Sequence, residues 1–280
     1  MSFFGSKKKT PPPPPVVPPP VPRSGPEIDA TTVISLLAVL ALLGGAYAAS
    51  IKVLPKTVTL KTRVLFIWHL FDALIHFVFE GSFLWNCFFV SYSLPTSFSA
   101  ASRNQHITLF TPPDVYWLGR QDLLYGANYG TGPLSRLWQE YAKADKRWGG
   151  TDLTVVALEL LTVFVAGPLA CWICYLLTKD EKRGVLKKYF WMIVLATGEI
   201  YGADTWFTAP LGWMTFAPEW LTGSPNLDTS NWMYLWLYLA FFNGLWVVFP
   251  LWILYEAYQA MSAAMSRAEM VDLVNYLKKD

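Results

Sequence analysis

Two histidines and two carboxylic acids recur at steps of three and four residues inside one apolar stretch. They are His69, Asp72, His76 and Glu80. In a helix these steps place the side chains on one face, and side chains four residues apart can touch. An imidazole and a carboxyl group in contact can share one proton near neutral pH, as a general acid or base must. The spacing therefore predicts a proton-transfer pair at His76 and Glu80. The alternative is a structural polar pair that joins helices.

Three later apolar stretches also carry polar or aromatic groups. Glu159 and Thr162 lie one turn apart, as do Asn243 and Trp246, and Glu199, Tyr201 and Asp204 lie around the small Gly198 and Gly202. A threonine hydroxyl can hold a carboxyl group or bond back to its own helix. A tryptophan face in a dry pocket stabilises a cation by about 2 kcal/mol or more. Packing alone would explain Trp246 in a chain with 14 tryptophans. Because Trp246 accompanies acids and an asparagine, we expect its ring to stabilise a cation in a pocket.

Acidic groups inside apolar stretches need a reason, because an ionisable group at the centre of a bilayer costs at least about 2.5 kcal/mol. Such groups indicate an internal cavity. Protonation of an alkene there, followed by loss of a neighbouring proton, would move a double bond through a carbocation. This chemistry needs no cofactor, and the sequence has no nucleotide loop or Rossmann fingerprint. His76 and Glu80 offer two metal ligands without an obvious third, so no metal is expected.

The composition indicates that a membrane positions these groups. Of 280 residues, 54% are hydrophobic and only 15% are charged, against about 25% charged in typical soluble domains. The net charge of +2 excludes nucleic acid as the main partner. Five stretches approach the roughly 20 apolar residues that a spanning helix needs. They predict an all-α, polytopic membrane protein, a five-helix bundle with an internal ligand cavity. The five stretches are Thr31–Leu54, Val64–Phe89, Asp152–Leu177, Tyr189–Phe207 and Trp232–Tyr255.

The remaining segments are predicted to lie outside the bilayer. Residues 1–30 form a disordered, proline-rich tail, because the run PPPPPVVPPPVP favours polyproline II and cannot build a core. This tail is either a solvated spacer or a ligand for a proline-reading domain. Residues 134–148 alternate apolar and charged side chains at helical spacing, which predicts an amphipathic helix on the membrane surface. Residues 261–280 form a polar cytosolic tail behind the membrane domain of residues 31–260.

Basic residues predict the orientation, because they mark the cytosolic ends of spanning helices. The loops after the first and third stretches contain Lys56, Lys61 and Arg63, and Lys179, Lys182, Arg183, Lys187 and Lys188. The loop after the fourth stretch contains no lysine or arginine. Five spans place the termini on opposite sides, so the N-terminus is expected in the lumen and the C-terminus in the cytosol.

The same residues lie in segments that resemble the emopamil-binding protein family, whose members include sterol Δ8-Δ7 isomerases. The resemblance covers roughly residues 30–260. Its most specific segments are IHFVFEGSF (75–83), LWQEYAKADKRW (137–148), LELLTVFVAGPLACW (158–172), GEIYG (198–202) and FFNGLWVVFPLW (241–252). They match a His-x-x-x-Glu-Gly pair, a Trp-x-Glu-Tyr-Ala-Lys segment, a Glu-x-x-Thr with Gly-Pro and an Asn-x-Leu-Trp.

The resemblance implies an EXPERA-type domain with five membrane helices in the endoplasmic reticulum. Its members shift a sterol double bond from C8 to C7 by protonating C9 and removing a C7 proton. Carried over residue by residue, His76, Glu80 and Glu159 would transfer the protons, with Thr162 supporting Glu159. Asn243 would position the acid–base groups and Trp246 would face the cation. Glu199, Tyr201 and Asp72 are expected supporting residues. The resemblance implies a sterol or sterol-like substrate and cationic amine inhibitors; a homodimer is an open alternative.

Two departures bear on the substrate. Trp148 stands where family enzymes usually carry tyrosine, and Ala203 precedes Asp204 where an acid often follows the glycine directly. An isomerase of another polycyclic terpenoid is therefore one alternative. A non-catalytic protein that binds sterols or cationic amphiphiles is a second. A proton-coupled transporter would use the same acids, but it favours repeated halves, which the sequence lacks.

Overall fold

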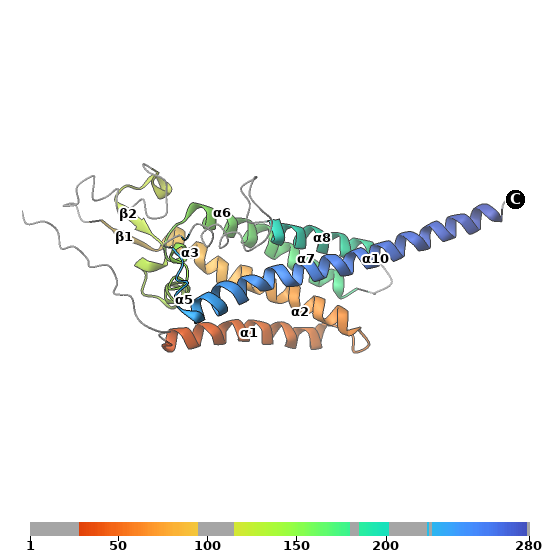
Figure 1. Ribbon diagram of the computed structural model, residues 1–280, viewed down its shortest axis with the longest axis horizontal. Coiled ribbons are helices and arrows are strands. Elements are labelled where there is room, and N and C mark those ends of the chain that lie inside the picture. The colour runs from red at the N-terminus through yellow and green to blue at the C-terminus, as the bar shows by residue number, and fades with distance from the viewer. Residues whose placement is uncertain (1–27, 95–114, 180–184, 202–222, 224–225, 279–280) are drawn as a thin grey trace, which may run out of the picture.

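The computed structural model describes residues 28–94, 115–179, 185–201, 223 and 226–278. In this part of the chain, long helices lie side by side along one axis (Figure 1). Two of them are interrupted by a π-helical segment and a third begins with one. In chain order the helical segments are α1 (Ala30–Val53), α2 (Leu60–Leu74), a π-helical segment (Ile75–Glu80), α3 (Gly81–Phe89), α6 (Leu153–Leu161), a π-helical segment (Thr162–Ala166), α7 (Gly167–Leu177), α8 (Val185–Tyr201), a π-helical segment (Met233–Phe242) and α10 (Asn243–Leu277).

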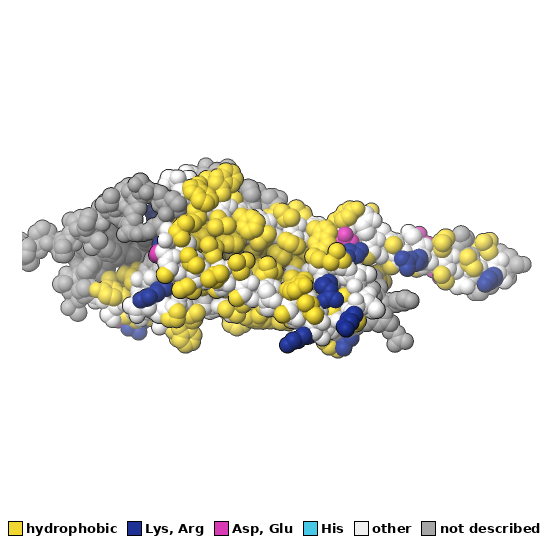
Figure 2. Space-filling model, turned by 90° about the horizontal axis from the view of Figure 1, so that it is seen from below, with side chains coloured by type: hydrophobic (Ala, Val, Ile, Leu, Met, Phe, Trp, Pro, Cys, Tyr) yellow, Lys and Arg dark blue, Asp and Glu magenta, His cyan; other side chains and the backbone are white. Residues whose placement is uncertain are grey.

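Four of the resulting helices are long and apolar enough to cross a membrane: Ala30–Val53, Leu60–Phe89, Leu153–Leu177 and Met233–Leu277. They coincide with four of the five predicted spans. Their outward faces carry exposed apolar side chains such as Leu40 and Phe164, and Figure 2 shows a wide hydrophobic band over the middle of one face. The chain is therefore a multi-pass membrane protein with an all-α membrane region.

The fourth predicted span begins in α8, which packs along α10 and α7. The described part of α8 has 17 residues, and the rest of the predicted span, residues 202–207, lies outside the described residues. The predicted proline-rich tail lies outside them as well, except for its last three residues.

The segment between α3 and α6 differs from its prediction. The prediction of one helix over 134–148 was wrong beyond residue 141. The helix there, α5 (Pro133–Tyr141), ends at Tyr141, and a 3-10 turn (Lys146–Gly149) follows. Between them the backbone pairs with a later segment, with Asp145 opposite Leu227. The buried Arg147 donates to the buried Asp145 carboxylate, at 2.6 Å from Nη2 to Oδ2. This local ion pair stabilises a turn where the charge pattern alone favoured more helix.

Four smaller elements in the described residues were not predicted. Strands β1 (Ser91–Ser93) and β2 (Leu123–Tyr125) form a short antiparallel ribbon. Two further 3-10 turns, Trp117–Gly119 and Ala127–Tyr129, flank β2. The all-α prediction therefore holds for the membrane helices and not for this segment outside them.

The last helix continues well past the predicted boundary at residue 260. α10 has 35 residues, a length of about 52 Å at 1.5 Å per residue, whereas the hydrocarbon core of a bilayer is about 30 Å thick. Its C-terminal part projects from the bundle (Figure 1). The polar tail is thus a direct continuation of the last membrane helix.

Polar contacts join α1 to α5 at one end of the bundle. Glu140 is 2% exposed, and its Oε1 accepts hydrogen bonds from Thr32 Oγ1 at 2.8 Å and Tyr238 Oη at 3.1 Å. Lys143 forms ion pairs with Glu140 and with Asp29, the N-cap of α1. The Thr32 backbone N–H lowers the pKa of Asp29. Desolvation opposes protonation of Lys143, but the hydrogen bonds and negative charges of Glu140 and Asp29 together outweigh it and raise the Lys143 pKa.

Candidate active site

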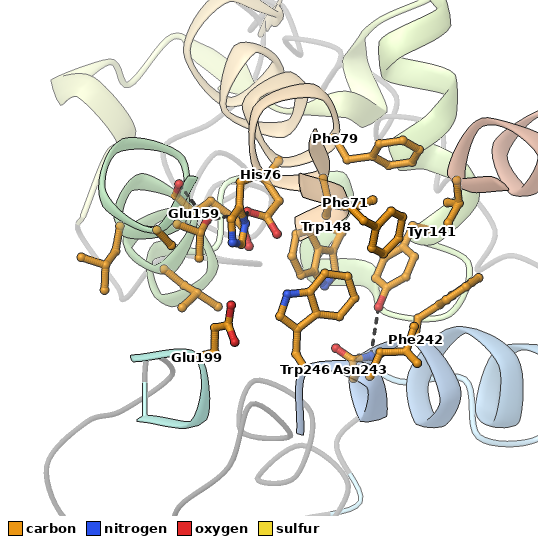
Figure 3. A pocket seen from close by; sticks show the side chains of 18 of the residues that line it. Phe71, His76, Phe79, Tyr141, Trp148, Glu159, Glu199, Phe242, Asn243 and Trp246 are labelled. Atoms are coloured by element: carbon orange, nitrogen blue, oxygen red, sulfur yellow. Dashed lines mark hydrogen bonds and ion pairs between the residues drawn. The ribbon is translucent and has the colours of Figure 1, made fainter. Parts of the chain in front are cut away.

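A cavity of about 420 Å³ lies in the middle of the bundle, between two apolar clusters. Along the second long helix, Leu65 packs in one cluster, His76 and Glu80 line the cavity, and Phe83 packs in the other. The volume is within the range of about 300–1,000 Å³ that is typical of small-molecule sites. Its wall is mostly apolar, with a few polar groups (Figure 3). This is the composition that a lipid-like ligand requires.

His76 contacts a carboxyl group through each of its ring nitrogens. Its Nδ1 lies 2.5 Å from Glu80 Oε2, and its Nε2 lies 3.1 Å from Asp72 Oδ1. His76 is 2% exposed and Asp72 is fully buried. The contact with Glu80 is a hydrogen bond, which is strong in such a low-dielectric setting, whereas the contact with Asp72 is an ion pair without hydrogen-bond geometry. The expected His76–Glu80 contact is thus present, and Asp72 extends it to three groups.

Trp246 links this triad to the last helix. Its Nε1–H donates to Asp72 Oδ1 at 2.9 Å, and its ring lies 6.3 Å from that of Phe71. Both rings line the cavity (Figure 3). The indole therefore orients Asp72 through its N–H group while the ring itself forms part of the wall.

Glu159 lies on the third long helix beside Glu80, with which it interacts electrostatically. It is 2% exposed, and Thr162 Oγ1 donates to its Oε2 at 3.2 Å. Figure 3 shows Glu159 beside His76. Two acids and an imidazole from two helices thus meet at one side of the cavity.

Glu199 comes from α8 and lines the cavity on another side. In the described part of the chain, neither of its buried carboxyl oxygens accepts a hydrogen bond. A carboxyl oxygen of Asp72, a ring nitrogen of His76 and a carboxyl oxygen of Glu199 all lie within 4.8 Å of one another. They form a compact group of one imidazole and two carboxyl groups, which shares only His76 with the pair considered from the sequence.

Asn243 lies away from these acids. Its side-chain amide donates to Tyr141 Oη at 3.2 Å and to the backbone oxygens of Tyr238 and Leu239, as the dashed line in Figure 3 shows for Tyr141. Burial raises the pKa of Tyr141, so its hydroxyl stays protonated at neutral pH. This pair offers the cavity a neutral polar group at a distance from the acids.

The backbone deviates from a regular α-helix where the site residues are carried. His76 and Glu80 lie in the π-helical segment Ile75–Glu80, and Thr162 begins a second one. The His76 carbonyl accepts from Gly81, and the Thr162 carbonyl accepts from Gly167, each five residues on. π-Helical turns are rare and occur frequently at functional sites.

Other predicted site residues lie elsewhere or cannot be placed. His69 is buried outside the cavity wall, and its Nδ1 bonds to the Leu65 carbonyl of its own helix at 2.7 Å. The side chain of Tyr201 and the whole of Asp204 lie outside the described residues.

Several lining residues were not singled out from the sequence. Tyr141 and Glu140 lie within the quoted LWQEYAKADKRW segment, and Trp148 was noted only as a departure. Trp148 packs in parallel against Trp138, with 5.0 Å between ring centroids. The available signal was the helical spacing of Leu137, Glu140 and Tyr141, which places them on one face of α5.

Comparison with known proteins supports the resemblance over part of the chain. Residues 133–257 match the model of the EXPERA (EXPanded EBP superfamily) family. This segment contains Glu159, Thr162, Glu199, Asn243 and Trp246, whereas His76 and Glu80 precede it. The resemblance inferred from the sequence is therefore confirmed there.

Individual relatives are named as isomerases or synthases. The 3-beta-hydroxysteroid-Delta(8),Delta(7)-isomerase of Mus musculus is 30% identical over 134 residues, 48% of this chain and 52% of that protein. The enzyme of the same name from Cavia porcellus is 33% identical over 118 residues, 42% and 45% of the two chains. Protoglabretal synthase of Ailanthus altissima is 26% identical over 152 residues, 53% and 60%. The chain thus spans about half the length of the curated relatives it matches.

Proposed function

We propose that this protein is a membrane isomerase that moves a carbon–carbon double bond in a polycyclic terpenoid, with a Δ8 sterol as the first candidate substrate. The observation that carries this proposal is His76, held between the carboxyl groups of Glu80 and Asp72 with Glu159 beside them, in an apolar cavity walled by Trp246. Such a site can give and take protons next to a hydrocarbon without a solvent molecule.

The proposed reaction conserves its protons. One carboxylic acid of the cavity wall protonates an alkene carbon, C9 in a Δ8 sterol, which leaves a carbocation at the neighbouring carbon. A carboxylate then removes the C7 proton, and the electron pair of that C–H bond forms the new double bond. Trp246 stabilises the cation through its ring face. Thr162 fixes the orientation of Glu159 through its hydroxyl group.

The cavity supports a ligand that enters from the lipid. Its described lining residues include apolar side chains from every long helix. Four of these helices are long and apolar enough to cross a membrane, so the cavity lies at the depth of the bilayer. In the proposed topology α8 is the fifth spanning helix, the protein resides in the endoplasmic reticulum, and the N-terminus is lumenal. Cationic amines would bind the acids by imitating the carbocation.

A different polycyclic terpenoid is the second candidate substrate. Its support is the similarity to protoglabretal synthase together with Trp148, which adds an indole to the cavity wall at the position where the resembled family usually has tyrosine. A larger aromatic side chain changes the shape of the wall more than it changes the acid–base chemistry.

The test is expression in a cell line that lacks its own Δ8-Δ7 isomerase, followed by sterol profiling with gas chromatography and mass spectrometry. We expect Δ8 sterols to fall and Δ7 sterols to rise. Glu80→Gln and Glu159→Gln should each lower turnover by about 10² to 10⁴, while Glu256→Gln, which removes a surface ion pair with Lys61, should not. Unchanged Δ8 sterols at normal expression would refute the sterol assignment, and wild-type turnover in both cavity variants would refute the residue roles.

A further inference from the structure

The contacts of His76 continue beyond the pair that the spacing predicts. From Glu80 they pass through both ring nitrogens of His76 to Asp72, and Glu199 lies within 4.8 Å of the last two. Glu80 and Glu199 both line the cavity, whereas Asp72 lies behind the wall. This series of groups thus begins and ends at the cavity, His76 also lines it, and only Asp72 lies behind the wall.

The charges of this series of groups do not balance without bound protons. Around His76 the cavity wall contains the carboxyl groups of Glu80, Glu159 and Glu199, and the lining residues that the structure describes include no lysine or arginine. Carboxyl groups this close in an apolar site cannot all be ionised, so they share protons. Asp72 and Glu199, which lie within 4.8 Å of each other, can interact favourably only when one of them carries a proton, because carboxylates only accept hydrogen bonds.

Within this series of groups, Glu199 is the one whose carboxyl oxygens are not engaged in hydrogen bonds of the described structure and can act on a ligand. Both of its carboxyl oxygens are buried without a hydrogen-bond donor in the described structure. Figure 3 shows the carboxyl group directed into the cavity, on the opposite side of the Trp246 indole from Tyr141. A buried polar group without a partner costs about 1–3 kcal/mol. A protonated carboxyl group aimed at a substrate gives a reason to retain it.

We propose that Glu199 is a further catalytic acid–base group of this site, and that Asp72 and His76 conduct protons between Glu199 and Glu80. The proposal rests on the isomerase function above and assigns the second wall of the cavity. The substrate then lies between carboxyl groups on two different helices, one of which gives a proton while the other removes one from a nearby carbon.

The relay returns the three carboxyl groups to their starting protonation states after each turnover. Glu199 gives its proton to the alkene and becomes a carboxylate, while Glu80 takes a proton from the substrate and becomes a carboxylic acid. Glu80 then passes its proton to His76 Nδ1, His76 Nε2 passes its own to Asp72, and Asp72 passes one to Glu199. Asp72 ends as it began, whereas His76 ends with its proton on Nδ1, and that proton must return to Nε2 before the next forward turnover. The reverse reaction uses the same path.

A metal ion at Asp72, His76 and Glu199 is the competing interpretation. It would occupy His76 Nε2 and block the relay, so the two are mutually exclusive. Asp72 Oδ1 already accepts the Trp246 N–H, and a fourth protein ligand, usual in structural zinc sites, is absent from the described donor set.

The kinetic test compares the full-length wild-type protein with Glu199→Gln, Asp72→Asn and the surface control Glu256→Gln, using the Δ8 sterol or the terpenoid that the wild type isomerises. Glu199→Gln should lower kcat about 10²-fold with little change in KM, and Glu199→Asp should restore part of it. In mixtures of H₂O and D₂O, a plot of the wild-type rate against the fraction of D₂O should be curved, because several protons move together. Asp72→Asn should make that dependence linear, which a merely structural residue would not do.

Infrared difference spectra test the shared proton without turnover. The wild type should show a C=O band of protonated carboxyl groups that Glu199→Gln removes and Asp72→Asn shifts. Full turnover in Glu199→Gln, an unchanged band in that variant, or a stoichiometric metal lost from it would each overturn the proposal. An inactive wild type and an inactive Glu256→Gln would refute the isomerase function instead, and the infrared band would still decide the proton sharing.

Discussion

At the scale of single residues, the site combines groups that burial would make costly on their own. His76, Asp72 and Glu159 are each 2% exposed or less, and every one of them contacts another polar side chain. Removing one partner of such a buried pair leaves the other without compensation. Substitutions that preserve shape and delete one hydrogen bond are therefore the most informative.

Thr162→Val is a substitution of this kind. It keeps the branched side chain and removes the hydroxyl that donates to Glu159 Oε2. We expect turnover to fall about tenfold, in line with the roughly 1.4 kcal/mol that a lost hydrogen bond to an acid–base group can contribute to a transition state. Thr162→Ser keeps the donor and should retain most of the activity. Equal activity of the valine and serine variants, measured on purified protein at saturating substrate, would contradict a role for this bond.

Part of the site was predictable at this scale and part was not. His76 and Glu80 were predicted as a pair because a four-residue spacing within one helix nearly determines their contact. Glu199 was noted as a supporting residue, but its approach to Asp72 and His76 could not be predicted. That approach depends on how α8 packs against α10 and α7, and no spacing within one helix records it.

At the scale of helices, the two site-bearing helices approach each other at Gly167. A Cβ atom there would lie 3.0 Å from the Phe77 ring and 3.3 Å from His76 Cβ. The small residue thus lets the third long helix come close to the π-helical segment that carries His76. Gly-Pro was recognised in the sequence as a motif, but its packing partner was not predictable from it.

Gly167→Ala should therefore destabilise the protein and displace His76. Overpacking of a tight contact costs typically about 1–3 kcal/mol, so we expect a lower melting temperature in detergent and a loss of turnover larger than the loss of folded protein. Gly44→Ala is the matched control, because a Cβ there meets nothing within 4 Å and alanine favours helix. A Gly167→Ala protein as stable and active as the control would show that the close approach is not required.

The same scale explains the errors of the sequence reading. The apolar runs predicted the long helices well, because about 20 apolar residues in a row have few other folded solutions. The π-helical segments have the same composition as their α-helical neighbours, so hydropathy could not reveal them. The turn after Tyr141 depends on pairing with residues near Leu227, a contact distant in sequence.

At the scale of the whole molecule, the two ends of the bundle differ in chemistry. One end holds α5 and the ion pairs of Lys143 with Glu140 and Asp29. At the other end, Lys179 and Lys187 lie over the rings of Tyr175 and Trp172, and Figure 2 shows most of the visible lysine and arginine side chains toward the end from which α10 projects. Basic and aromatic side chains together are typical of a membrane interface on the cytosolic side.

This asymmetry predicts that the two termini lie on opposite sides of the membrane. α1 starts at the end that holds α5, and α10 leaves the bundle at the basic end (Figure 1). With a tag at each terminus, protease added to sealed microsomes should remove the C-terminal tag and leave the N-terminal tag intact. Detergent should expose both tags, which controls for protease access. Digestion of both tags in sealed vesicles would mean an even number of crossings, in which α8 does not span the membrane. Glu199 would then not lie within the membrane, and the second wall of the site depends on that position.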